Sequence, residues 1–217
     1  VRRVLYVKFK MGLFEDPYGE RYAHCKMHPQ EGVQLSKEIS DESVVLLKNE
    51  NGLLPLNAEK LRSVAVIGPN ADQVQFGDYT WSRNNKDGVT PLAGIRQLLG
   101  DKVTVRYEKG CSLVSLDTSG IKKAVEVARQ SEVAIVFCGS ASAALARDYK
   151  SSTCGEGFDL NDLNLTGAQS QLIKEVYETG TPVVLVLVTG KPFTISWEKK
   201  HIPAILTQWY AGEQAGN

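Results

Sequence analysis

The stretch Val133-Ala134-Ile135-Val136-Phe137-Cys138 decides the fold class. It is an unbroken apolar run, which is typical of a strand that is buried on both faces of a sheet. Runs of the same kind occur at 64–67 and 183–188, and between the runs the apolar residues recur at helical spacing, as in 121–129. Strands that alternate with helices predict an α/β fold: a mainly parallel sheet with helices on both faces, an α/β sandwich.

The other expected elements complete this pattern. We expect an opening helix that ends near Gly12, helices over 30–48, 91–99 and 167–178, and strands over 103–107 and 204–209. The stretch from Thr166 to Gln169 has the spacing of a capping box and predicts the start of the helix at 167. Because the chain stops shortly after the last strand, we expect the sheet domain to be truncated at its C-terminus.

Composition narrows the function classes. The chain has 217 residues, 42% of them hydrophobic, and its 25 basic and 25 acidic residues give a formal net charge of zero. A neutral chain does not favour nucleic acid or an anionic membrane as a partner. No apolar run approaches the roughly 20 residues of a membrane-spanning helix. From the neutral charge and the short apolar runs together, we expect no nucleic-acid partner and no membrane partner.

Metal chemistry is not indicated either. The four cysteines form no C-x-x-C pair, which argues against a zinc ribbon or a thioredoxin-like site. His24 and His28 have i,i+4 spacing, but no glutamate follows His24 as in H-E-x-x-H, and Pro29 argues against a helix there. We expect a surface pair and no metal site.

A long polar loop between the strand at 133–138 and the helix at 167–178 carries the candidate chemistry. In it, Glu156 lies between Gly155 and Gly157, so no bulky neighbour shields its carboxylate. Ligands of open α/β sheets bind at the carboxyl ends of the strands, where this loop emerges. Glu156 is therefore the candidate catalytic residue.

Four further residues are candidates for binding substrate. Arg147 and Asp148 of the same loop form either a ligand-binding pair or a solvated ion pair. Trp81, in the loop after the first parallel strand, either stacks on a sugar ring or packs against the protein. Asp159, three residues after the candidate glutamate, is the fourth.

Two other classes of site lack their motifs. Neither G-x-G-x-x-G nor G-x-x-x-x-G-K-[ST] occurs, and Pro69 removes an amide that a phosphate-binding turn would use. Gly139-Ser140-Ala141-Ser142 follows a strand but lacks the G-x-S-x-G of a nucleophile elbow. A nucleotide-binding module is therefore a weaker hypothesis for this chain than a catalytic role for Glu156.

Several blocks, in order along the chain, resemble the second domain of glycoside hydrolase family 3. They are the domain entry at 43–49, 53–56 and 64–71, the block at 90–95, the segment at 209–216, and Gly155-Glu156-Gly157-Phe158-Asp159 with Leu163, Leu165, Gly167 and Gln169. The last block resembles the loop that carries the acid/base in this family. Leu160 departs from the family pattern, where many relatives carry an arginine after the aspartate.

The resemblance implies a retaining, exo-acting β-glycosidase, most often a β-glucosidase or β-xylosidase that acts on a β-linked oligosaccharide or glycoside without a cofactor. A TIM-barrel first domain of the same parent chain supplies the nucleophilic aspartate, and the α/β sandwich supplies the general acid/base, here Glu156. The resemblance also favours a periplasmic or extracellular location.

The same resemblance divides the chain. Residues 1–18 map to the tail of the barrel, 19–62 to a linker and entry helix, and 63–217 to an incomplete α/β sandwich domain. The alternative function is a non-catalytic carbohydrate-binding or interaction domain that kept this fold.

Overall fold

In a computed structural model, the described residues are 1–217 without 21–22, 26–27, 83 and 143–151. The chain forms two compact units, Val1–Ser36 and Lys37–Asn217. The first contains α1 (Arg2–Lys10), which ends before Gly12 as the sequence predicts. The unit boundary falls within α2 (Gln30–Ser43).

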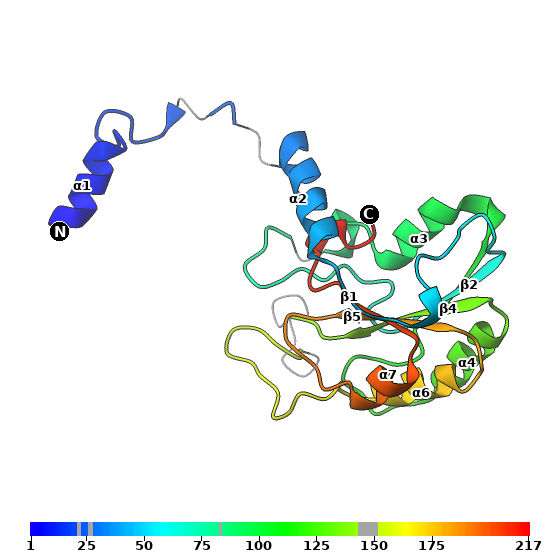
Figure 1. The fold of residues 1–217 in the computed structure, drawn as a ribbon. Helices are drawn as coiled ribbons and strands as arrows, with labels where there is room; N and C mark the ends of the chain where they lie inside the picture. Colours follow the sequence, from blue (N-terminus) through cyan, green and yellow to red (C-terminus); the bar gives the residue numbers. More distant parts are fainter. Residues whose placement is uncertain (21–22, 26–27, 83, 143–151) are drawn as a thin grey trace. The chain divides into compact units, whose positions relative to one another are not determined.

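The second unit is built on one six-stranded sheet of order β1-β6-β5-β4-β2-β3 (Figure 1). Its strands are β1 (Val45–Asn49), β2 (Ser63–Ile67), β3 (Thr104–Glu108), β4 (Val133–Gly139), β5 (Val183–Val188) and β6 (Ala204–Thr207). The strands β2 to β6 pair in parallel with their neighbours, and β1 pairs antiparallel with β6. The sheet is therefore mainly parallel, as predicted, and β3 lies at its edge.

Helices cover both faces of the sheet. They are α3 (Pro91–Leu99), α4 (Ile121–Arg129), α6 (Gln169–Tyr177) and α7 (Ser196–His201), with short 3-10 turns at Glu50–Gly52, Asn85–Asp87, Gly100–Lys102 and Gly212–Gln214. Figure 1 shows α4, α6 and α7 on one face and α3 on the other.

The core follows from the alternation of side chains along the strands. On β2, Ala65 and Ile67 pack with α4 and α6, whereas Val64 and Val66 pack on the opposite face with Leu92 of α3. β5 contributes to both clusters in the same way and is buried along its whole length. Burial on both faces explains the unbroken apolar runs and confirms the α/β sandwich.

The prediction of a helix over 30–48 is wrong after residue 43. The helix ends at Ser43, whose hydroxyl donates to the Ser40 carbonyl oxygen at 2.8 Å. The chain then forms β1, with Val45 opposite Thr207 and Asn49 opposite Ala204 of β6. The run Val44–Leu47 is rich in β-branched residues, and its pairing with a strand far along the chain decides its conformation.

The predicted capping box at Thr166 is also wrong. α6 begins at Gln169, and its N-cap residue, Ala168, makes no side-chain cap bond. The Thr166 hydroxyl instead donates to the Leu113 carbonyl oxygen at 2.6 Å. The Gln169 side chain accepts from the Gly139 amide at 2.8 Å and donates to the Gly139 carbonyl oxygen at 3.0 Å. The Gln169 side chain therefore holds the end of β4, and the Thr166 hydroxyl bonds to the loop at Leu113 rather than capping the helix.

Two of the four cysteines fill the core as small side chains. Cys138 is fully buried and Cys111 is 7% exposed, and neither forms a disulfide. Burial raises the pKa of the Cys111 thiol to about 11 and the pKa of Cys138 above its ordinary value. Both thiols stay protonated near neutral pH, which suits an apolar environment.

Replacing Gly68 with alanine should destabilise the second unit. Gly68 follows β2 with a φ of 114°, and an added Cβ would lie 2.1 Å from the Phe137 carbonyl oxygen. Backbone strain of this kind costs about 1–3 kcal/mol, and the overlap adds to it. Gly77→Ala is the matched control, because a Cβ there meets nothing within 4 Å. Chemical denaturation should give a clearly lower unfolding free energy for Gly68→Ala only; equal values would contradict the prediction.

Candidate functional site

The loops that follow the parallel strands meet at the carboxyl edge of the sheet, which is the usual ligand edge of this architecture. The loop after β2 carries Asp78, and the loop after β4 returns through Cys154 to Glu156. Thr189 and Lys191 follow β5, and Tyr210 follows β6. The candidate residue Glu156 therefore lies where three other strands end.

Glu156 stands at the tip of a tight turn. Gly155 has a φ of 132° and Gly157 a φ of 68°, which are conformations that side-chain-bearing residues rarely adopt. The Phe158 amide donates to the Gly155 carbonyl oxygen at 3.1 Å and closes the turn. A Cβ at residue 157 would meet nothing within 4 Å, so the backbone conformation rather than space requires glycine there. The turn leaves the Glu156 side chain exposed to solvent.

Asp78 contacts both arms of this loop: the arm that leaves β4, at Ser142, and the arm that returns, at Glu156. One carboxylate oxygen, Oδ2, accepts the Glu156 amide at 2.7 Å, and the other, Oδ1, accepts the Ser142 hydroxyl. A parallel bridge between Ser142 and Cys154 joins the same two arms. Sequence reasoning missed Asp78; the only available signal was its place in a loop that leaves the carboxyl end of β2, next to β4.

The base of the loop is tied to the end of β6 by Tyr210. Its hydroxyl lies 2.6 Å from Ser140 Oγ and 2.9 Å from Cys154 Sγ. Burial raises the pKa of Tyr210 above its ordinary value, and the contact with Cys154 raises it further. The phenol therefore keeps its proton and can donate a hydrogen bond. Tyr210 was not among the predicted site residues.

A second set of contacts closes the loop base around Thr153. The Thr153 hydroxyl accepts from the Ala141 amide at 2.8 Å, and the Thr153 amide donates to the Ala141 carbonyl oxygen at 3.1 Å. Ser152 and Thr153 are both buried. The loop thus has a buried, hydrogen-bonded base and an exposed tip that carries Glu156.

The other predicted site residues differ in their surroundings. The Asp159 side chain is 88% exposed, and its Oδ1 lies 4.0 Å from Nζ of Lys191, whose side chain is 14% exposed; at this length the contact is weak. Trp81 is 62% exposed, and its ring meets the Phe76 ring edge-on at 6.4 Å. Arg147 and Asp148 lie outside the described residues. Substrate binding by these four residues stays a prediction.

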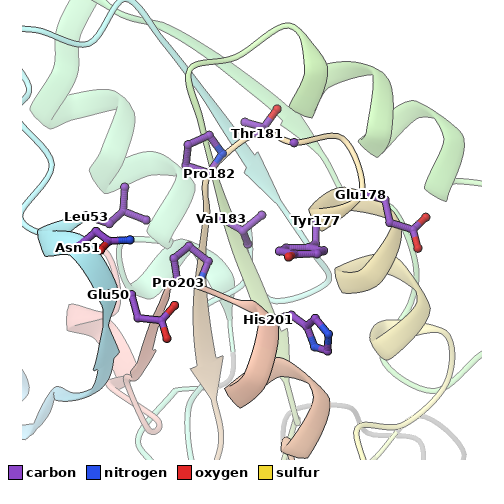
Figure 2. Close-up of a pocket in the computed structure, with 11 residues that line it drawn as sticks. Glu50, Asn51, Leu53, Tyr177, Glu178, Thr181, Pro182, Val183, His201 and Pro203 are labelled. Carbon is purple, nitrogen blue, oxygen red and sulfur yellow. The ribbon is translucent and has the colours of Figure 1, made fainter.

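A cavity of about 650 Å³ lies at the opposite edge of the sheet, beside the starts of β5 and β6. Figure 2 shows Tyr177 of α6 and His201 at the end of α7 facing Leu53 and Glu50 across Val183. The His201 ring stacks on Trp197 with centroids 4.3 Å apart, and its Nδ1 lies 2.8 Å from the Trp197 carbonyl oxygen. This cavity is separated from Glu156 by the length of the strands and is not part of the candidate site.

Within the part of the chain that the structure describes, no group of three or more His, Cys, Asp or Glu side chains could hold a metal ion. Over the same residues, no helix has the length and apolar character needed to cross a membrane.

Comparison with known proteins gives one family. Residues 44–217 match the model of the glycosyl hydrolase family 3 C-terminal domain. Over 99% of this chain, the sequence is 34% identical to a β-xylosidase of Formosa agariphila. Over the whole of this chain, it is 34% identical to a periplasmic β-glucosidase of Salmonella typhimurium. It spans 30% of the length of each of these two relatives.

Solved structures that are similar to this chain agree with the family match. The chain is similar to a β-glucosidase from Listeria innocua in complex with isofagomine, with a TM-score of 0.82 and 28% identity. The match covers 99% of this chain and 28% of that one.

Tyr210→Phe should lower stability through the loop base. It removes a partly buried hydroxyl with two partners, and the loss of one such hydrogen bond costs about 0.5–1.5 kcal/mol. Tyr79→Phe is the control, because Tyr79 is exposed. We expect chemical denaturation to separate the two variants by about 1 kcal/mol or more. Indistinguishable unfolding free energies would mean that the Tyr210 contacts do not stabilise the loop base.

Proposed function

Because the chain belongs to glycosyl hydrolase family 3, we propose that it is part of a retaining, exo-acting β-glycosidase and supplies the general acid/base through Glu156. The relatives named above are a β-xylosidase and a β-glucosidase. The proposed substrate is therefore a glycoside or oligosaccharide with a terminal β-linked xylose or glucose. The chain spans less than a third of these relatives, so the proposed activity is that of a longer protein.

The observation that carries this proposal is the position of Glu156. Its backbone is held at the carboxyl edge of the sheet by a 2.7 Å hydrogen bond to Asp78, and its side chain is exposed at the tip of a glycine turn. An acid that must reach a sugar bound on another domain needs this combination of a fixed backbone and an open side chain. A solvated surface carboxylate would not need a turn of this kind.

The nucleophile is proposed to lie on a TIM barrel of the same parent protein. A retaining glycosidase needs two carboxyl groups about 5–5.5 Å apart. Both oxygens of Asp78 accept hydrogen bonds from the loop, and Asp159 lies beside Lys191. We assign the nucleophile to neither of them, because the family resemblance implies an aspartate on the barrel domain. The barrel tail at residues 1–18 and the linker and entry helix at 19–62 stay part of this proposal; within the second segment, residues 45–49 form β1 of the sheet.

The chemistry then proceeds in two steps. In the first, the barrel aspartate attacks the anomeric carbon while Glu156 gives its proton to the departing glycosidic oxygen. In the second, Glu156, now a carboxylate, takes a proton from water, and the water oxygen displaces the aspartate. The two displacements give a product with retained configuration.

Glu156→Ala in the longer enzyme should lower activity in a way that depends on the leaving group. Substrates with poor leaving groups should lose about 10²–10⁴-fold, because their departing oxygen needs the proton. Dinitrophenyl glycosides should still form the covalent intermediate and then stall, since water lacks its base. Azide, which needs no base, should restore turnover and give a β-glycosyl azide.

The control for this experiment is Glu59→Ala, an exposed glutamate in the loop that precedes β2. It should behave as wild type with every leaving group. If Glu156→Ala instead lost activity evenly, without azide rescue, Glu156 would be structural. If the intact protein bound saccharides without hydrolysing them, the alternative, a carbohydrate-binding domain of the same fold, would be favoured.

The 217-residue chain alone should not hydrolyse aryl β-glycosides, because the proposed nucleophile lies outside it. The measurement is release of the aryl group by purified, folded chain from a host without β-glycosidases. Circular dichroism should confirm that the preparation is folded. Turnover that disappears in Glu156→Ala would show that the chain contains its own second carboxylate and would contradict the two-domain site.

A further inference from the structure

We propose that Asp78 is the positioning residue of Glu156: its carboxylate fixes the backbone from which the proposed general acid/base projects. The inference rests on the proposed function of Glu156 and adds a residue from a different loop. Asp78 accepts the backbone amide of Glu156, so it would act through Glu156 rather than on the substrate.

Each carboxylate oxygen of Asp78 accepts a hydrogen bond from a different residue of the loop after β4. Oδ2 accepts the Glu156 amide at 2.7 Å, and Oδ1 accepts the hydroxyl of Ser142 on the other arm of the loop. Hydrogen bonds to an ionised carboxylate are shorter and stronger than those between neutral groups. One side chain thus ties the loop after β2 to both arms of the loop after β4.

The turn around Glu156 explains why such a tie is needed. The buried base ends at Cys154, where the bridge to Ser142 and the contact with Tyr210 lie. Beyond it, Gly155 and Gly157 flank the glutamate, and glycine has the widest backbone freedom of any residue. In the part of the loop that the structure describes, the Gly155–Phe158 closure restrains the turn as a whole, and the bond from Asp78 adds a restraint at the Glu156 amide itself.

A displacement of about 1 Å can cost a catalytic group about 10²-fold in rate. Asp78 therefore affects the reaction if it keeps the carboxyl group of Glu156 within that tolerance. This effect falls on proton transfer, and it should be largest for substrates that depend on the acid.

The loop that carries Asp78 has its own supports, so variants at this position should fold. Asn85 Oδ1 accepts the Val74 amide at 2.6 Å, and the Gly212 amide donates to the Gln75 carbonyl oxygen at 3.1 Å. Phe76, two residues before Asp78, is 2% exposed. These contacts do not involve the Asp78 side chain.

The test compares Asp78→Ala, Asp78→Asn and Asp162→Ala in the longer enzyme. Asp78→Ala should lower kcat/KM by about 10–100-fold for aryl glycosides with poor leaving groups, and much less for dinitrophenyl glycosides. Asp78→Asn should recover most of the loss, because the amide oxygen can accept the Glu156 amide while its NH₂ donates to Ser142 Oγ. Asp162→Ala should leave kcat/KM unchanged, since this aspartate is exposed and, among the described residues, accepts the Asn164 amide of its own turn.

A second readout follows the contact itself. Hydrogen exchange at the Glu156 amide should be faster in Asp78→Ala than in the wild type, and intermediate in Asp78→Asn. Thermal unfolding of each variant shows whether the fold is kept; if Asp78→Ala unfolds, Asp78→Asn carries the comparison, with a smaller loss of the same leaving-group dependence.

Measuring Glu156→Ala in parallel separates the two ideas. If Glu156→Ala shows leaving-group dependence and azide rescue but Asp78→Ala loses activity evenly or not at all, the positioning role is overturned and the acid/base role stands. If Glu156→Ala lacks both signatures, the proposed function fails, and the positioning role fails with it even where exchange at residue 156 rises.

Discussion

The parallel pairing of β4 with β2 and β5 is the constraint on which the site depends. Residues 134–139 of β4 lie opposite 183–188 of β5, and 133–136 lie opposite 64–67 of β2. Because the strands run the same way, the loops that follow them leave from one edge of the sheet. Burial of β4 between α4 and α6 on one face and the α3 side on the other fixes this arrangement. Asp78 and Glu156 meet for this reason, although they are far apart in the sequence.

The end of β4 is then held by side chains rather than by further sheet. Gly139 has a φ of 151°, and a Cβ there would lie 1.9 Å from the Val188 carbonyl oxygen, so the backbone of β5 requires glycine. The Gln169 side chain bonds to both polar atoms of the same glycine and is itself fully buried. Buried polar groups stabilise a structure when they are fully paired. This pairing directs the chain from the sheet into the loop that carries Glu156.

Local patterns predicted the strands that are buried on both faces and the helices that carry a clear apolar face. The apolar runs at β4 and β5 and the helices α3 and α4 were expected within a residue or two, because their own side chains determine their conformation. β1 was missed, since an exposed strand next to a helix depends on its pairing with β6. Thr166 matched a capping pattern but bonds to Leu113, a partner that no local spacing indicates. At the site, the glycines around Glu156 marked the turn, whereas Asp78 and Tyr210 act across loops and left no local signal.

These contacts divide the loop into two regions with different physical demands. The base is paired internally through Thr153 and Ala141, and externally through Tyr210, so it has few alternative arrangements. The tip has two glycines and one charged tie, which leaves the Glu156 carboxyl group exposed while its backbone stays fixed. The two-domain site that we propose would need both properties: its acid would have to project beyond its own sheet, yet the backbone that carries the acid would have to stay in place when the sugar enters between the domains. A shorter, fully packed loop would fix the backbone but would not extend beyond the sheet. A glycine loop without the Asp78 hydrogen bond would extend beyond the sheet but would not hold its backbone in place.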